Sequence, residues 1–313
     1  MYRSMYRSAR FVLVVLLGAA GPTVHPAKRV MAASLGLAGI HPAAAQTQHA
    51  TLKTASATAP DIPFNYETQA FEAQAKDELL RLANSVRHQA GAPALTLDSG
   101  LSQAARIHAQ AMLEAHQLSH QFSGEASLAV RLAAMTDLQL DQEGENVAVD
   151  YDPQQGHEHL MNSPPHRANL LNPAYNVVGL AVVRSGEQIY IVQDFGHAVP
   201  AYSTTEWKAR IASDVNQARR QSRQSDLQRQ DLSAADEAAC SMAQADKLGT
   251  APVRKLAERY TVLSYTSLHP EALPDGAMRA IAEHNLRNFS VGACYARTNT
   301  YPTGMYWIVL TLE

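Results

Sequence analysis

The stretch NSPPHRANLLNP, residues 162–173, places two adjacent prolines and a histidine beside two residues that can cap a helix. Proline is excluded from a helix interior but is accepted in the first helical turn, and Asn162 or Ser163 can serve as the N-cap. His166 then lies in that first turn, where the helix dipole favours the neutral imidazole. The stretch therefore predicts a helix start that presents a histidine to a cleft. A capped turn with a surface histidine is the alternative.

Amphipathic helices are predicted on the N-terminal side of this stretch. Residues 71–89 and 101–117 carry apolar side chains at helical spacing, and Asp98 or Ser99 can cap the second segment. His108 lies on the apolar face of the second helix. We therefore expect His108 to be a core residue.

Two further histidines and a glutamate are candidates for the cleft. His116 and His120 are four residues apart, a spacing that can place two imidazoles on one helical face as metal ligands. Of the two we favour His120, and we expect His116 to face solvent. Glu145, in the segment GENVAV, is expected where the chain changes direction. A carboxylate standing alone at such a turn would be exposed.

Strands are predicted after the opening stretch. Residues 176–196 alternate apolar side chains on both sides of Ser185 and Gly186, which is the pattern of a two-stranded hairpin. The predicted helices would thus flank a small antiparallel sheet. The fold class that we predict is α/β, with helices covering the faces of the sheet.

Composition indicates a globular protein. The 313 residues carry a net charge of -3 and are 46% apolar, enough for two modest domains, and the charge excludes nucleic acid as an expected partner. Basic residues precede the apolar run FVLVVLLGAA, residues 11–20, which has the length of a signal peptide. We predict that residues 1–45 are a signal peptide cleaved after Ala45, or else an uncleaved N-terminal anchor. Residues 46–62 read as a linker.

Export follows from that interpretation, so the expected location is secreted, periplasmic or extracellular. Contact with a membrane is expected only if the N-terminal segment remains uncleaved. Cys240 and Cys294 are the two cysteines of the chain, and an even number in an exported protein permits one disulfide.

Five motifs, taken together, resemble the bacterial CAP domain, also called SCP-like, of the superfamily of cysteine-rich secretory proteins, antigen 5 and pathogenesis-related proteins. They are LSH at 118–120, GENVAV at 144–149, MNSPPHRANLLNP at 161–173, VGLAVV at 178–183 and YIVQDFG at 190–196. The resemblance covers residues 64–197, and we assign the domain to residues 63–200. It implies an α-β-α sandwich with a cleft lined by two histidines and acidic residues, in which some family members bind zinc.

The resemblance implies that His120, Glu145 and His166 line the cleft. His120 and His166 would be the metal ligands, with Glu145 either as third ligand or hydrogen-bonded to a ligand. A second acid, which many eukaryotic members carry before the second histidine, has no match in this sequence. Within the predicted helix 154–162, His157, Glu158 or His159 would substitute only if the helix turned it inward.

The C-terminal part echoes the first domain. NQARRQ at 216–221 resembles NSVRHQ at 84–89, and similar pairs join 238–248 to 104–113, 291–296 to 178–183 and 306–312 to 190–196. We predict that residues 201–313 form a shortened, degenerate CAP-like unit, structural or partner-binding, with Cys240 on its helix, Cys294 on its strand and a disulfide between them. Met242 takes the place of His108, and His284 is interpreted as a remnant of the second histidine. An unrelated helical appendage with a terminal hairpin is the alternative.

Three functions are compatible with these patterns. We favour an exported binding module whose cleft holds a small ligand or a divalent metal such as zinc. A zinc-dependent hydrolase would use His120 and His166 as ligands and Glu145 as general base, but the chain has neither a GxSxG nor an HExxH motif. A cell-wall- or lipid-binding protein is the third possibility and rests on export and family resemblance alone.

Overall fold

The computed structural model describes residues 14–16 and 66–313. The predicted signal peptide or anchor at 1–45 and the linker at 46–62 therefore lie outside the described residues, apart from the short strand β1 (Val14–Leu16). Within the described residues, no helix is long and apolar enough to cross a membrane.

The first sheet has four strands in the order β2-β4-β5-β3. β2 pairs parallel with β4, whereas β4 with β5 and β3 with β5 are antiparallel. The strands are β2 (Thr96–Leu97), β3 (Gln139–Asp150), β4 (Val177–Ser185) and β5 (Gln188–Val199). The predicted hairpin is confirmed, since Ser185 pairs with Gln188 across its turn.

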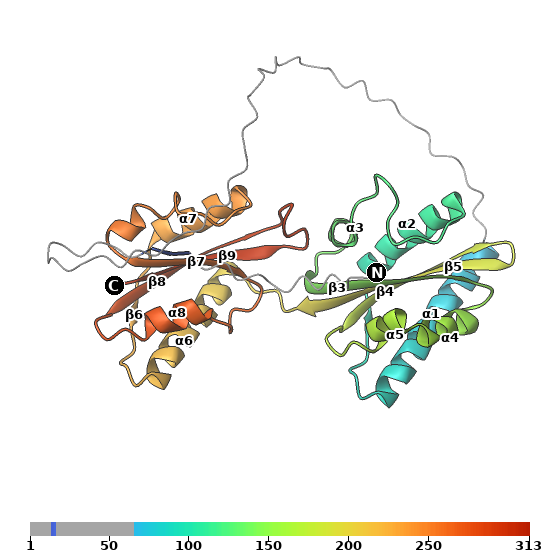
Figure 1. Ribbon diagram of the computed structural model, residues 1–313, viewed down its shortest axis with the longest axis horizontal. Helices are drawn as coiled ribbons and strands as arrows, with labels where there is room; N and C mark the ends of the chain where they lie inside the picture. Colours follow the sequence, from blue (N-terminus) through green and yellow to red (C-terminus); the bar gives the residue numbers. More distant parts are fainter. Residues whose placement is uncertain (1–13, 17–65) are drawn as a thin grey trace, which may run out of the picture. The chain divides into compact units, whose positions relative to one another are not determined.

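Helices cover both faces of this sheet (Figure 1). They are α1 (Tyr66–Gln89), α2 (Ser99–Ala115), α3 (Leu128–Met135), α4 (Pro153–Asn162) and α5 (Pro164–Leu171). One core cluster joins α1, α4 and α5 to one face of the sheet, and two others join α2 and α3 to the opposite face. The predicted α-β-α sandwich is confirmed.

Local sequence explains where α2 begins and ends. The Asp98 carboxylate accepts a 2.7 Å hydrogen bond from the backbone N–H of Leu101, as expected of an N-cap. The helix ends at Ala115, and the C-cap residue His116 adopts a left-handed conformation with φ of 47°. His116 is exposed to solvent, as predicted. Between these ends His108 is fully buried, which confirms its placement in the core.

The expectation that Glu145 lies at a change of chain direction is wrong. Glu145 lies within β3, where it pairs with Asp194 of β5 in an antiparallel register. The Gly144 that suggested a turn is instead a strand residue that makes room for Tyr175, because a Cβ at Gly144 would lie 2.4 Å from the tyrosine hydroxyl.

The second sheet repeats the strand order of the first. Its order is β1-β7-β9-β8-β6. Read from the other edge, the order β6-β8-β9-β7 corresponds strand by strand to β2-β4-β5-β3 of the first sheet, and the parallel and antiparallel pairings are the same. The strands are β6 (Gln228–Arg229), β7 (Thr261–Ser267), β8 (Asn288–Ala296) and β9 (Met305–Leu312). β1 adds a fifth strand beside β7. The second unit therefore has the same four-strand topology as the first.

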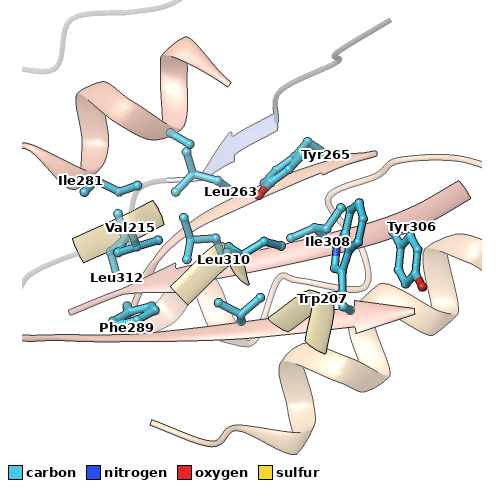
Figure 2. Packing of buried hydrophobic residues seen from close by; sticks show 14 of the residues in the cluster. Trp207, Val215, Leu263, Tyr265, Ile281, Phe289, Tyr306, Ile308, Leu310 and Leu312 are labelled. Carbon is cyan, nitrogen blue, oxygen red and sulfur yellow. The ribbon is translucent and has the colours of Figure 1, made fainter. Parts of the chain in front are cut away.

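Helices also enclose the second sheet. They are α6 (Thr204–Gln221), α7 (Ser233–Gln244) and α8 (Asp275–Ile281), with a 3-10 turn at Leu256–Glu258. Figure 2 shows the core that α6 and α8 form with the sheet, in which the rings of Trp207 and Tyr306 stack 4.0 Å apart. α7 packs on the opposite face.

Buried polar anchors recur in the two units. Asn84 exchanges two hydrogen bonds with the backbone of Leu95, and Asn216 does so with Leu227. Arg87 and Arg219, three residues after these asparagines, are both buried and donate to backbone carbonyls on distant segments. The similarity of NSVRHQ and NQARRQ is therefore a similarity of structural roles.

Glycines at one equivalent position let a helix approach the sheet. A Cβ at Gly179 would lie 2.1 Å from the backbone carbon of Leu101, and a Cβ at Gly292 would lie 2.2 Å from that of Ala235. Glycine is required where helix backbone and strand come this close.

The strand register corrects the terminal overlay by one residue. Asp194 pairs with Gly179, and Val309 pairs with Gly292, so that Val309, rather than Leu310, is the counterpart of Asp194. Through the same pairing, Ser264 on β7 takes the position that Glu145 has on β3.

The interpretation of His284 as a remnant of the second histidine is also wrong. Arg87 binds the carbonyls of Leu170 and Asn172, and Arg219 binds those of Ile281 and Glu283, an offset of 281 − 170 = 111 residues. The same offset carries His166 to position 166 + 111 = 277, an alanine. His284 is an exposed residue beyond the end of α8.

The predicted disulfide is confirmed. Cys240 on α7 and Cys294 on β8 are bonded, with their Cα atoms 5.0 Å apart. The bond ties a helix to the sheet of the second unit.

Candidate functional site

The three predicted cleft residues converge beside the edge strand of the first sheet. His120 comes from the segment between α2 and α3, Glu145 from β3 and His166 from the first turn of α5. The ring centres of His120 and His166 lie 6.4 Å apart, and Nδ1 of His120 lies 2.9 Å from Oε1 of Glu145. The fold therefore brings together residues that are 25 and 21 positions apart in sequence.

Glu145 is a buried carboxylate held from two sides. Its side chain is 4% exposed. Oε1 faces His120, and Oε2 accepts a charge-assisted hydrogen bond from Nη2 of Arg131. Arg131 also donates from Nη1 to the backbone carbonyl of His120, at 3.2 Å. Arg131 thus orients both members of the His120–Glu145 pair.

Amide side chains place the backbone that carries the second histidine. Nδ2 of Asn146 donates to the carbonyl of His166 at 3.1 Å, and Nδ2 of Asn169 donates to the carbonyl of Glu145, also at 3.1 Å. Asn169 Nδ2 also bonds Oδ1 of Asn146 at 3.0 Å. These bonds connect α5 to β3 and fix where His166 lies relative to Glu145.

The environment of His166 favours its neutral form. Burial lowers the pKa of His166, and the nearby His120 lowers it further. Neutral imidazole is the form that binds metal ions and accepts hydrogen bonds. His120 is more open, with 34% of its side chain exposed, so the pair opens toward solvent on the His120 side.

A second layer of buried charge lies behind Glu145. Nε2 of His108 is 2.8 Å from the carbonyl of Ser119, and Nδ1 is 2.7 Å from Oε1 of Glu125. Burial would raise the pKa of Glu125, but hydrogen bonds from the Phe122 N–H and from His108 outweigh it and lower the pKa. Both ring nitrogens of His108 therefore lie within hydrogen-bond distance of an acceptor atom, which fixes the orientation of the ring.

Sequence comparisons identify the family to which this part of the chain is similar. Residues 80–195 match the profile of the Cysteine-rich secretory protein family, CAP. This segment is a CAP domain. Over 110 residues the chain is 30% identical to the uncharacterized protein YkwD of Bacillus subtilis, a match that covers 35% of this chain and 42% of YkwD. The chain thus spans less than half the length of that relative.

Solved structures are also similar to the CAP domain. An extracellular protein containing an SCP domain from Bacillus anthracis is 25% identical, with a TM-score of 0.38, over 43% of this chain and 44% of that protein. A cysteine-rich secretory protein from Staphylococcus aureus is 20% identical, with a TM-score of 0.33, over 40% of this chain and 39% of that protein.

The site offers two imidazoles as candidate metal ligands rather than a set of three ligands. In the part of the chain that the structure describes, no group of three or more His, Cys, Asp or Glu side chains is arranged to hold a metal ion. Both oxygens of Glu145 already accept hydrogen bonds, so Glu145 fits the role of holding the ring of His120 rather than that of third ligand. The same two bonds disfavour Glu145 as the general base of a hydrolase.

The residues considered as substitutes for a missing acid have other partners. Glu158 is exposed and accepts from Gln154, and His159 bonds Asp150. His157 is turned inward, but into the core beneath α4, where burial lowers its pKa.

Sequence reasoning missed Arg131, Glu125 and Asp194. Arg131 and Asp194 each interrupt a run of apolar residues, in LAVRLAAM and YIVQDFG respectively. A charge inside an apolar run is a signal of a buried, paired group, and it could have identified both.

Proposed function

We propose that the CAP domain is a binding module whose cleft holds a divalent transition-metal ion, or a small polar ligand, between His120 and His166. The observation that carries this proposal is the facing pair of imidazoles, one of them held through Nδ1 by a buried carboxylate. A carboxylate that bonds one ring nitrogen of a histidine fixes the ring and favours metal binding at the other nitrogen. When bound, a metal such as zinc would act as a Lewis acid toward a ligand in the cleft.

Weak binding is expected of such a site. Structural zinc sites use four protein ligands, and catalytic sites use three, whereas this cleft offers two. Water or the ligand itself would complete the coordination sphere. We further propose that the protein acts outside the cytoplasm, in keeping with the signal-peptide pattern at its N-terminus and with the bond between its two cysteines.

Calorimetric titration of the purified full chain with zinc at neutral pH tests the proposal. The wild type should take up one zinc ion per chain, and H120A and H166A should each abolish the binding. H284A is the matched control, because it also removes a histidine but from an exposed position in the second unit. No zinc uptake by the wild type, or undiminished uptake by H166A, would refute the metal site.

A further inference from the structure

A fully buried acid, Asp194, lies next to the cleft carboxylate. Asp194 on β5 is directly opposite Glu145 on β3, so the two side chains lie on the same face of the sheet. Asp194 is completely buried, and among the described residues neither of its oxygens receives a hydrogen bond from a donor group. Two adjacent buried carboxylates do not both ionise, because the second negative charge is strongly disfavoured.

Charge balance indicates which of the two is neutral. Of the charged groups that act on Asp194, Arg131 contributes one positive charge, and Glu125 and Glu145 contribute two negative ones. An ionised Asp194 would add an uncompensated charge to a buried cluster. Burial raises the pKa of Asp194 well above its ordinary value and the charge of Glu145 raises it further, whereas Arg131 opposes the shift.

The second unit is an internal comparison for this cluster. Ser264 occupies the position of Glu145, and Val309 that of Asp194. Met242 is fully buried, as His108 is, at the equivalent place on α7. The second unit thus lacks a counterpart of Asp194 as well as counterparts of Glu145 and His108, although its sheet keeps the same register. Asp194 therefore belongs to the charged cluster and is not a requirement of the fold.

We propose that Asp194 is a positioning residue for the cleft, which remains a neutral acid and donates its proton to Glu145. The hydrogen bond holds the Glu145 carboxylate in the orientation that receives Nδ1–H of His120. The effect on metal affinity rests on the proposed function. The protonation of Asp194 and its bond to Glu145 do not.

Two variants of the full chain separate the roles of Asp194. In D194N the side chain keeps its shape and a donor but cannot ionise, whereas D194A removes the donor. D150N is the control, because Asp150 is also a buried acid of the CAP domain but accepts hydrogen bonds from His159 and from the Tyr151 N–H.

Infrared difference spectroscopy at neutral pH reads the protonation state directly. The wild type should show the C=O stretch of a protonated carboxylic acid, and this band should disappear in D194N but remain in D150N. D194N should resist urea at least as well as the wild type, because it replaces an uncharged acid by an uncharged amide that keeps a donor. D194A removes that donor and should be less stable. A purely structural role for Asp194 would not produce the acid band.

Zinc titration adds the functional readout. D194N should bind zinc as the wild type does, and D194A should bind about tenfold more weakly, the lower end of the effect of removing an outer partner of a metal ligand. Absence of the acid band, or a D194N variant as impaired as D194A, would overturn the proposal. If the wild type binds no zinc, the proposed function fails while the infrared and stability results still decide the state of Asp194.

Discussion

Replacement of Arg87 by methionine should destabilise the CAP domain and displace its second histidine. The guanidinium of Arg87 is fully buried and donates four hydrogen bonds to backbone carbonyls. The acceptors are Pro93 at 2.7 Å, Leu170 and Asn172 at 2.9 Å and Tyr175 at 2.8 Å. Three of them follow one another at the C-terminal end of α5 and just beyond it, so Arg87 anchors the helix that carries His166.

The size of the effect follows from these four bonds. A hydrogen bond to a charged group contributes about 1.5–3 kcal/mol, and a buried carbonyl left without a donor costs about 1–3 kcal/mol. Because water can reach some of the freed carbonyls, we expect Arg87→Met to lower the free energy of unfolding by about 4 kcal/mol. With a urea dependence of about 2 kcal/mol per molar, the unfolding midpoint of the domain should fall by about 2 M.

Arg219→Met is the matched control in the second unit, where the arginine binds three carbonyls. Both tryptophans of the chain, Trp207 and Trp307, belong to the second unit, so tryptophan fluorescence follows that unit while circular dichroism follows both. Arg87→Met should shift the dichroism transition more than the fluorescence transition and weaken zinc binding. Arg219→Met should shift fluorescence most. A midpoint change below about 0.5 M for Arg87→Met would refute the anchoring role.

Three further outcomes are expected. Gly179→Ala should cost about 1–3 kcal/mol in a urea titration, because its Cβ would meet the backbone of α2; an unchanged midpoint would show that the helix moves freely. A variant with serine at both Cys240 and Cys294 should lower the stability of the second unit by about 4 kcal/mol, because the disulfide closes a loop of 54 residues. Urea unfolding followed by tryptophan fluorescence measures this loss, and equal unfolding midpoints for the variant and the wild type would contradict it. Burial lowers the pKa of His157 from 6.5, against smaller opposing effects of Glu158 and Glu78. The contribution of neutral His157 to the free energy of unfolding is therefore complete above about pH 6.5 and is lost as the pH falls through the folded pKa. His157→Gln should flatten this part of the plot of stability against pH, and an unchanged plot would count against a buried neutral His157.

Much of the CAP domain could be predicted because its signals are local. The cap at Asp98, the hairpin on either side of Ser185 and the buried position of His108 each follow from periodicity or turn chemistry within a few residues. The cleft residues His120 and His166 are on separate elements, and their meeting was predicted through family resemblance rather than through spacing.

The remaining features depend on pairing between strands distant in sequence. The one-residue correction that makes Val309 the counterpart of Asp194 comes from sheet register, and a slip of one residue reverses which face a side chain occupies. Glu145 was expected at a turn because glycine and asparagine beside it favour turns, and only the register with β5 identifies it as a buried strand residue. The assignment of His284 failed for a related reason, since the carbonyls bound by Arg219, not sequence similarity, show which residue of α8 corresponds to His166.

The repetition of one topology within a single chain creates a hazard during folding. Each sheet holds a short edge strand by a parallel ladder of two residues, β2 with β4 and β6 with β8, and such short ladders can be exchanged between the copies. Interdomain misassembly of this kind is characteristic of repeat proteins. Cys240 and Cys294 are the two cysteines of the sequence, and their bond closes only when α7 has docked on its own β8. Formation of the disulfide would thus fix the correctly assembled second unit. The strands of the first unit would then pair only with one another.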